Sequence, residues 1–131
     1  MDSTILVVED DPHLREVITE VLSDEGYDVY EAMDGQRALE RIESLVPDLV
    51  LSDIRMPRLS GIELAERLKQ RRHPIPIVLM STSNNAPAGD GPPFLAKPFA
   101  LDDLVALVAR ILHNNGALGG GRAPGNLAYL P

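Results

Sequence analysis

The chain has 131 residues, 44% of them hydrophobic, and a formal net charge of -8 from 20 acidic and 12 basic residues. This length fits one domain, and the acidic balance argues against binding a nucleic-acid backbone or an anionic membrane, which both need a basic face. The absence of cysteine excludes disulfides, thiol catalysis and thiolate metal sites. No segment is typical of a signal peptide or membrane span, so we expect a cytoplasmic protein.

Short continuous apolar runs recur along the chain and predict strands. They occupy residues 5–8, 49–51 and 77–80. Continuous runs of this length are typical of strands covered on both faces, as in a parallel sheet. Residues 27–31 are more polar and favour an edge strand.

Segments of helical period lie between these strands, and each carries one apolar stripe. The stripes are Leu14, Val17, Ile18, Val21 and Leu22, then Ala38, Leu39, Ile42 and Leu45, and near the end Leu101, Leu104, Val105, Val108, Ile111 and Leu112. Start signals agree, because Asp11 precedes Pro12, Asp34 precedes a glycine, and Ser60 with Glu63 forms a capping box. The alternation predicts a doubly wound α/β sheet.

Polar side chains that are able to bind ions or to react follow the predicted strands. Glu9, Asp10 and Asp11 follow the first, Asp53 the third, Ser81 and Thr82 the fourth, and Lys97 the fifth. Ligands bind beyond the carboxyl ends of an open parallel sheet, so we expect these groups to share one crevice. Clustered carboxylates suit a hard divalent cation, above all Mg²⁺. A carboxylate beside such a cation can attack phosphorus, while Lys97 and a hydroxyl neutralise the phosphoryl oxygens.

Three motifs end the predicted strands: ILVVEDDP at residues 5–12, LSDIRMP at 51–57 with Gly61 following, and KPF at 97–99. Together they resemble the CheY-like receiver domain of two-component response regulators, over roughly residues 3–113. The match is specific because each motif lies at the end of its own strand. The resemblance implies a five-stranded parallel sheet of strand order 2-1-3-4-5, of the flavodoxin or CheY-like type.

The resemblance also implies a role for each site residue. Asp53 accepts the phosphoryl group, and Lys97 contacts that group. Asp10 binds Mg²⁺ directly, Glu9 acts on the metal through water, and the backbone carbonyl of Arg55 completes the metal shell. Pro98 follows a cis peptide bond, and Ser81 and Phe94 take the hydroxyl and aromatic switch positions. Asp11 is interpreted as a helix cap only.

The segment between Ser81 and Lys97 departs from the family pattern. It is shorter than in most receivers, which carry a helix there, and residues 83–93 hold three prolines and two glycines. Because these residues break helices, we predict a missing or irregular helix and an incomplete dimer surface. Our hypothesis is that residues 83–93 form an order–disorder switch.

Residues 114–131 are rich in glycine and proline and predict a tail or linker after a receiver domain of residues 1–113. The last residues of this segment are apolar. We hypothesise that Leu127, Tyr129 and Leu130 cover surface that the missing helix normally hides, in this chain or a neighbouring one.

The leading functional hypothesis is a receiver that takes a phosphoryl group from a sensor histidine kinase or a histidine phosphotransfer protein. It then changes conformation and acts on a downstream protein, with catalysis limited to its own phosphorylation and dephosphorylation. A homodimer with a non-standard interface is compatible with the altered surface.

Other functions remain as alternatives to this hypothesis. A pseudo-receiver, an interaction module that works without phosphorylation, is favoured by the altered helix but disfavoured by the intact Glu9, Asp10, Asp53 and Lys97. A haloacid dehalogenase-type hydrolase needs an aspartate where Arg55 stands, and a flavodoxin-like flavin protein needs a phosphate loop in place of the acids at residues 9–11.

Overall fold

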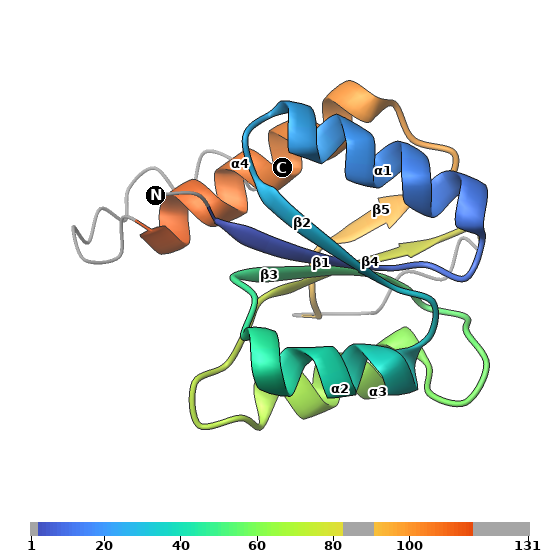
Figure 1. Cartoon of the computed structure of the whole chain (residues 1–131), viewed down its shortest axis with the longest axis vertical. Coiled ribbons are helices and arrows are strands. Elements are labelled where there is room, and N and C mark those ends of the chain that lie inside the picture. The colour runs from blue at the N-terminus through green and yellow to red at the C-terminus, as the bar shows by residue number, and fades with distance from the viewer. Residues whose placement is uncertain (1–2, 83–90, 117–131) are drawn as a thin grey trace.

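Five parallel strands form one sheet in the computed structural model, which describes residues 3–82 and 91–116, with side chains as far as His113 (Figure 1). The elements in chain order are β1 (Thr4–Val8), α1 (Pro12–Asp24), β2 (Asp28–Ala32), α2 (Gly35–Leu45), β3 (Leu49–Asp53), α3 (Gly61–Lys69), β4 (Ile77–Ser81), β5 (Phe94–Ala96) and α4 (Leu101–Gly116). The strand order is β2-β1-β3-β4-β5, which confirms the predicted fold, and the polar strand β2 lies at an edge.

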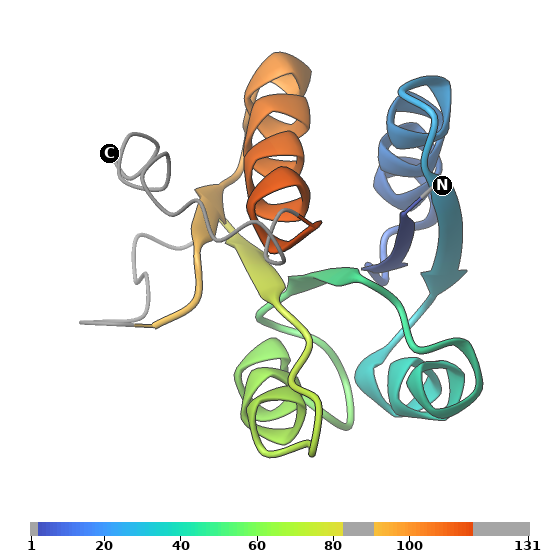
Figure 2. The same cartoon turned by 90° about the vertical axis from the view of Figure 1, so that its left-hand side faces the viewer.

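The sheet is covered on both faces, with α1 and α4 on one side and α2 and α3 on the other (Figure 2). Successive side chains of a strand point to opposite faces. In β1, Ile5 and Val7 therefore join the core beneath α1 and α4, whereas Leu6 and Val8 join the core beneath α2 and α3. The continuous apolar runs arise because each central strand serves two cores.

Local start signals of the helices are confirmed. Asp11 caps α1 by accepting hydrogen bonds from the backbone N–H groups of His13 and Leu14. Asp34 caps α2, and Ser60 forms the predicted capping box with Glu63 at the start of α3. These caps define where the chain leaves each strand end and begins to turn back, which leaves the carboxyl edge of the sheet open.

Three predictions concern residues outside the part of the chain that the structure describes. The switch hypothesis for residues 83–93 and the missing helix both rest on residues 83–90, outside the described part; residues 91–93 precede β5 and belong to neither a helix nor a strand. The covering role of Leu127, Tyr129 and Leu130 also lies outside it. Helix α4 continues to Gly116, three residues beyond the predicted domain boundary at residue 113. Among the described helices, none has the length and apolar character needed to cross a membrane.

Candidate functional site

Asp53 is the last residue of β3 and lies at the carboxyl edge of the sheet. It pairs with Met80 of β4, and the next residue, Ile54, donates its backbone N–H to the Met80 carbonyl oxygen at 2.9 Å. The carbonyl of Ile54 accepts a hydrogen bond from Gly61 at 2.8 Å. Asp53 is only 5% exposed, so β4 and the start of α3 hold a buried carboxylate at the strand end.

Lys97 joins this carboxylate to a second one. Its ammonium nitrogen lies 2.5 Å from Oδ1 of Asp53 and 2.8 Å from Oε1 of Glu9. The backbone N–H of Lys97 donates to the Ser81 carbonyl oxygen at 2.9 Å, which ties the residue to β4. The peptide bond between Lys97 and Pro98 is cis, as the resemblance implied. The residues that directly follow β1 and β5 thus meet the last residue of β3 in one cluster.

Glu9 is 1% exposed and is held at both ends. Its Oε2 accepts the backbone N–H of Asp11 at 3.0 Å, and its carbonyl oxygen accepts a hydrogen bond from Nη1 of Arg15 at 2.7 Å. Arg15 also donates from Nε to Oε1 of Glu31 at 3.0 Å. Sequence reasoning missed Arg15, because nothing in its spacing within α1 indicates that it points back to the strand end.

Three acids form a candidate cation site. Glu9, Asp10 and Asp53 each offer a carboxylate oxygen, and these atoms lie within 4.8 Å of one another. Oxygen ligands grouped around a small space suit a hard divalent cation. Asp10 is exposed while the other two acids are buried, so the site opens to solvent on one side. Within residues 3–82 and 91–113 no other group of three such ligands occurs, and Asp11 serves as the cap of α1.

The pKa values of the two buried acids in the cluster shift in opposite directions. Burial and then the hydrogen bond with Glu9 raise the pKa of Asp53 to about 8, against the opposing effect of Lys97. Burial also acts to raise the pKa of Glu9, but hydrogen bonds with Asp53, Lys97 and the Asp11 N–H outweigh it and lower that pKa. One proton is therefore retained on Asp53 at neutral pH when no cation is bound.

The pKa of Lys97 moves in the direction that keeps its charge. Burial lowers it, but hydrogen bonds to Asp53 and Glu9, with their negative charge, raise it above its usual value of 10.5. The ammonium is therefore present throughout the physiological range. It gives the cluster a permanent positive charge beside the Asp53 carboxyl.

The remaining predicted site residues lie around this cluster. Ser81 is buried at the carboxyl end of β4, one residue beyond the partner of Asp53. Phe94 is half-buried at the start of β5 and packs against the core beneath α2 and α3. Arg55 is exposed in the loop that follows β3, and its carbonyl as a metal ligand stays a prediction. The switch roles of Ser81 and Phe94 are likewise predictions.

The sheet order and the strand-end cluster define a CheY-like α/β protein. The family model of the response regulator receiver domain matches residues 5–109. The chain belongs to that family. This agrees with the resemblance carried by the strand-end motifs.

Individual relatives agree with the family assignment. The chain is 38% identical to the response regulator MprA of Mycolicibacterium vanbaalenii over 121 residues, which cover 86% of this chain and 51% of that protein. The chain therefore spans about half the length of the first curated relatives that it matches.

Solved structures agree as well. A putative response regulator from Chloroflexus aurantiacus has a TM-score of 0.79 and 30% identity, covering 86% of this chain and 99% of its own. The chemotaxis response regulator CheY4 of Vibrio cholerae has a TM-score of 0.77 and 26% identity, with 85% and 99% covered. This chain thus shares its fold with these response regulators over nearly the whole length of their solved chains.

Proposed function

We propose that this receiver accepts a phosphoryl group on Asp53 in a Mg²⁺-dependent reaction and thereby switches a downstream protein. The observation that supports this most directly is the contact of the Lys97 ammonium with both Asp53 and Glu9, beside the Asp10 carboxylate. An acid nucleophile, a fixed cation and a candidate metal site share one crevice. These are the parts that phosphoryl transfer to a carboxylate requires.

The transfer uses the Asp53 carboxylate as nucleophile. An oxygen of Asp53 forms a bond to phosphorus as the phosphorus–nitrogen bond of a phosphohistidine breaks, and the departing imidazole takes up a proton. Because Lys97 already lies against Asp53, its N–H groups are placed to neutralise the oxygens of the arriving phosphoryl group. The Ser81 hydroxyl, at the end of the neighbouring strand, is the proposed second donor.

The donor set fits Mg²⁺, with Glu9, Asp10, Asp53 and the Arg55 carbonyl as the proposed ligands, in part through water. When bound, Mg²⁺ supplies positive charge that favours the ionised form of Asp53 and neutralises the phosphoryl oxygens. The exposed Asp10 gives the cation access from solvent. The same residues also support hydrolysis of the acyl phosphate. The proposed catalysis is limited to the protein's own phosphorylation and dephosphorylation.

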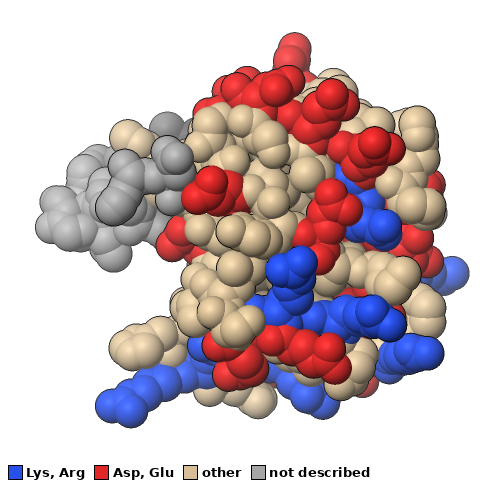
Figure 3. Space-filling model, in the orientation of Figure 1, with Lys and Arg blue, Asp and Glu red and all other residues tan. Residues whose placement is uncertain are grey.

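The proposed phosphodonor is a sensor histidine kinase or a histidine phosphotransfer protein, as expected for this family, and the proposed location is the cytoplasm. In the view of Figure 3, acidic side chains gather over the helices α1 and α4, and Lys and Arg side chains lie lower, towards α2 and α3. With the net charge of -8, this supports a protein rather than a nucleic acid as direct partner.

The experiment is phosphorylation by a small phosphodonor in the presence of Mg²⁺, followed by intact mass. We expect the added mass of one phosphoryl group, which disappears in Asp53→Asn and when Mg²⁺ is chelated. Equal incorporation in Asp53→Asn contradicts the proposal. No incorporation into the folded protein, while a known receiver in the same tube is phosphorylated, supports the pseudo-receiver alternative.

A further inference from the structure

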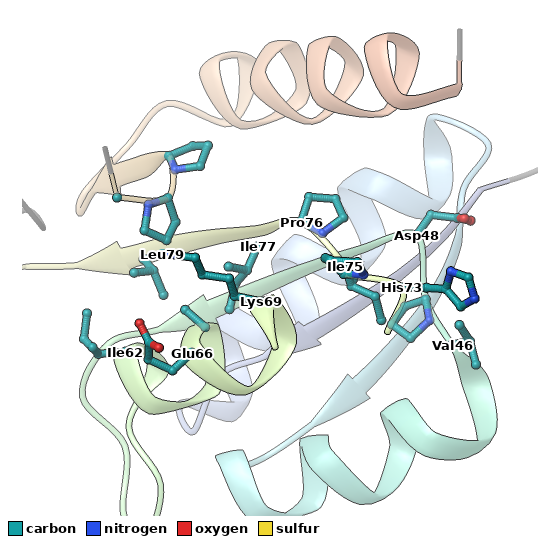
Figure 4. A pocket seen from close by; sticks show the side chains of 16 residues that line it. Val46, Asp48, Ile62, Glu66, Lys69, His73, Ile75, Pro76, Ile77 and Leu79 are labelled. Atoms are coloured by element: carbon teal, nitrogen blue, oxygen red, sulfur yellow. The ribbon is translucent and has the colours of Figure 1, made fainter. Parts of the chain in front are cut away.

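An apolar groove of about 910 Å³ lies beside α3, at the amino ends of β4 and β5 (Figure 4). Its floor and walls come from Ile62 and Ala65 of α3, Ile75 and Pro76 of the following loop, and Ile77 and Leu79 of β4. Glu66, Lys69 and His73 also line it. The groove is on the opposite side of the sheet from α4, and the acid cluster lies at the other end of the strands.

The apolar lining reaches the surface of the described structure. Ile62 is 42% exposed and Val46, which also lines the groove, is 53% exposed. Figure 2 shows α2 and α3 beneath the middle of the sheet and the β2 edge, whereas no helix of the described residues covers the same face beside β5. A contiguous apolar groove of this size usually marks a binding surface rather than a surface that contacts only water.

The composition of the chain distinguishes two segments that could fill this groove. Residues 83–90 contain only two alanines and one proline as apolar residues and carry no large side chain. Residues 126–131 read NLAYLP, with Leu127, Tyr129 and Leu130 and no charged side chain. An uncharged segment with three large apolar or aromatic side chains matches an apolar groove.

We propose that the segment of residues 126–131 docks in this groove of its own chain. Helix α4 runs back from the carboxyl edge and ends at the amino edge, the same edge at which β4 and β5 begin (Figure 1). The groove opens near that edge, among residues that precede β4 and β5. The docking segment therefore has to pass only around the β5 side of the sheet.

The intervening chain is long enough for this path. Residues 117–126 read ALGGGRAPGN, and a glycine-rich linker of this length has a root-mean-square span of about 17 Å and a fully extended reach of roughly 35 Å. A domain of this size has a radius of gyration of about 13 Å. Because the linker ties the segment to the groove at an effective concentration in the millimolar range, its own chain is the favoured occupant over a second copy.

The test is a paramagnetic nitroxide placed next to the docking segment. The chain has no cysteine, so Gly125→Cys gives one labelling site in the chain of residues 1–131. We expect the label to broaden the backbone amide signals of Lys69, His73 and Ile75, which line the groove away from the acid cluster, with the reduced nitroxide as reference. Amides that surround the acid cluster, at the opposite edge, keep their intensity.

Two matched variants control the measurement. Ile62→Asp puts a charge into the groove and is expected to abolish the broadening, and because Ile62 is exposed on α3 the fold survives. Leu101→Asp places the same charge at another exposed apolar side chain, at the start of α4, and is expected to leave the broadening intact. The dispersion of the amide spectrum reports folding of each variant directly.

Three results overturn the proposal. Removal of residues 126–131 that leaves the groove amide shifts unchanged shows that the segment does not dock. Broadening spread evenly over the surface shows a tail without a site. Broadening that appears only when a labelled, unenriched chain is mixed with an unlabelled, ¹⁵N-enriched one identifies a second copy as the occupant. None of these results depends on phosphorylation of Asp53.

Discussion

Asp53 retains a proton that an ordinary aspartate loses. Burial and the hydrogen bond with Glu9 raise its pKa from 3.8 to about 8 in the folded, metal-free chain. A carboxyl whose folded pKa lies above its unfolded pKa favours folding at low pH, and this contribution is lost as the pH rises through the folded value. The usual pKa values of Glu9, 4.5, and Lys97, 10.5, lie outside that window, and their shifts move both further from it.

We therefore predict that metal-free protein loses thermal stability from about pH 6 to about pH 9. Each pKa unit is worth about 1.4 kcal/mol, so even part of the shift moves the midpoint by about 3 °C or more. Asp53→Asn has no such proton and is expected to flatten this dependence. The measurement is a series of thermal unfolding curves in chelator, and parallel curves for the two proteins contradict the assignment of the proton to Asp53.

Asp10 is the exposed member of the acid cluster. Because it is exposed, we predict that Asp10→Asn changes the unfolding free energy by less than about 0.5 kcal/mol. Its loss as a ligand is expected to weaken Mg²⁺ binding about tenfold or more. Calorimetric titration with Mg²⁺ checks this prediction.

Asp11 provides the matched control for Asp10. Asp11→Asn removes the neighbouring carboxylate charge but keeps a good cap on α1, since asparagine caps helices as well as aspartate does. The expected loss of Mg²⁺ affinity is clearly smaller. Equal losses in the two variants indicate that net charge, rather than ligation by Asp10, governs binding.

Lys97 separates metal binding from phosphoryl transfer. Lys97→Met removes the cation from Asp53 and Glu9, and we predict a phosphorylation rate lower by about a hundredfold or more. Mg²⁺ affinity is expected not to fall, since a repelling charge has gone. Lys69, the other lysine of the chain, is exposed on α3, and Lys69→Met serves as the control that keeps the rate. An unchanged rate in Lys97→Met contradicts the proposed role.

At the scale of the elements, the start of α3 supports the end of β3. A Cβ atom added to Gly61 would lie closer to the carbonyl oxygen of Asp53 than real Cβ atoms approach other atoms. It would also collide with the backbone of Ile54. Because these are backbone atoms, they cannot turn aside as a flexible side chain does. The first residue of α3 therefore has to be glycine for Asp53 to keep its place.

We predict that Gly61→Ala costs about 1–3 kcal/mol in stability, as overpacking does, and displaces Asp53. A small displacement of a reacting group lowers the phosphorylation rate by about tenfold to a hundredfold. Ser60→Ala, one residue earlier, loses the capping hydrogen bond to Glu63 and about 1 kcal/mol but does not touch β3. Urea unfolding and phosphorylation rates distinguish the two, and a normal rate in Gly61→Ala contradicts the argument.

At the scale of the whole molecule, one sheet serves two cores. Leu22 of α1 packs in the core on one face and Leu68 of α3 in the core on the other, and both are essentially inaccessible to solvent. Since the central strands contribute side chains to both cores, disruption of either core should unfold the sheet as a whole. The molecule is expected to unfold in one cooperative step.

We predict that Leu22→Ala and Leu68→Ala each cost about 2–5 kcal/mol. Far-UV circular dichroism and amide signals from both cores should move together, with an unchanged dependence on denaturant. The test is equilibrium unfolding in urea followed by both methods. A variant in which one core melts before the other refutes the single cooperative unit.

Much of this structure could be predicted from the sequence because its signals are local. Apolar runs and helical periods indicated the elements, and Asp11, Asp34 and Ser60 marked helix starts through hydrogen bonds spanning only a few residues. The motifs at the strand ends identified Glu9, Asp10, Asp53 and Lys97 as one site. The strand order followed from family resemblance, since periodicity does not determine which strands are neighbours.

Other properties were decided only by the tertiary structure, because they depend on distances between residues far apart in the chain. The contact of Lys97 with Glu9, the hold of Arg15 on the strand end and the raised pKa of Asp53 all require the register and burial that packing sets. The groove beside α3 needs three separate segments to meet. Local interactions specify the elements of this protein, and the assembled sheet specifies its electrostatics and its open surfaces.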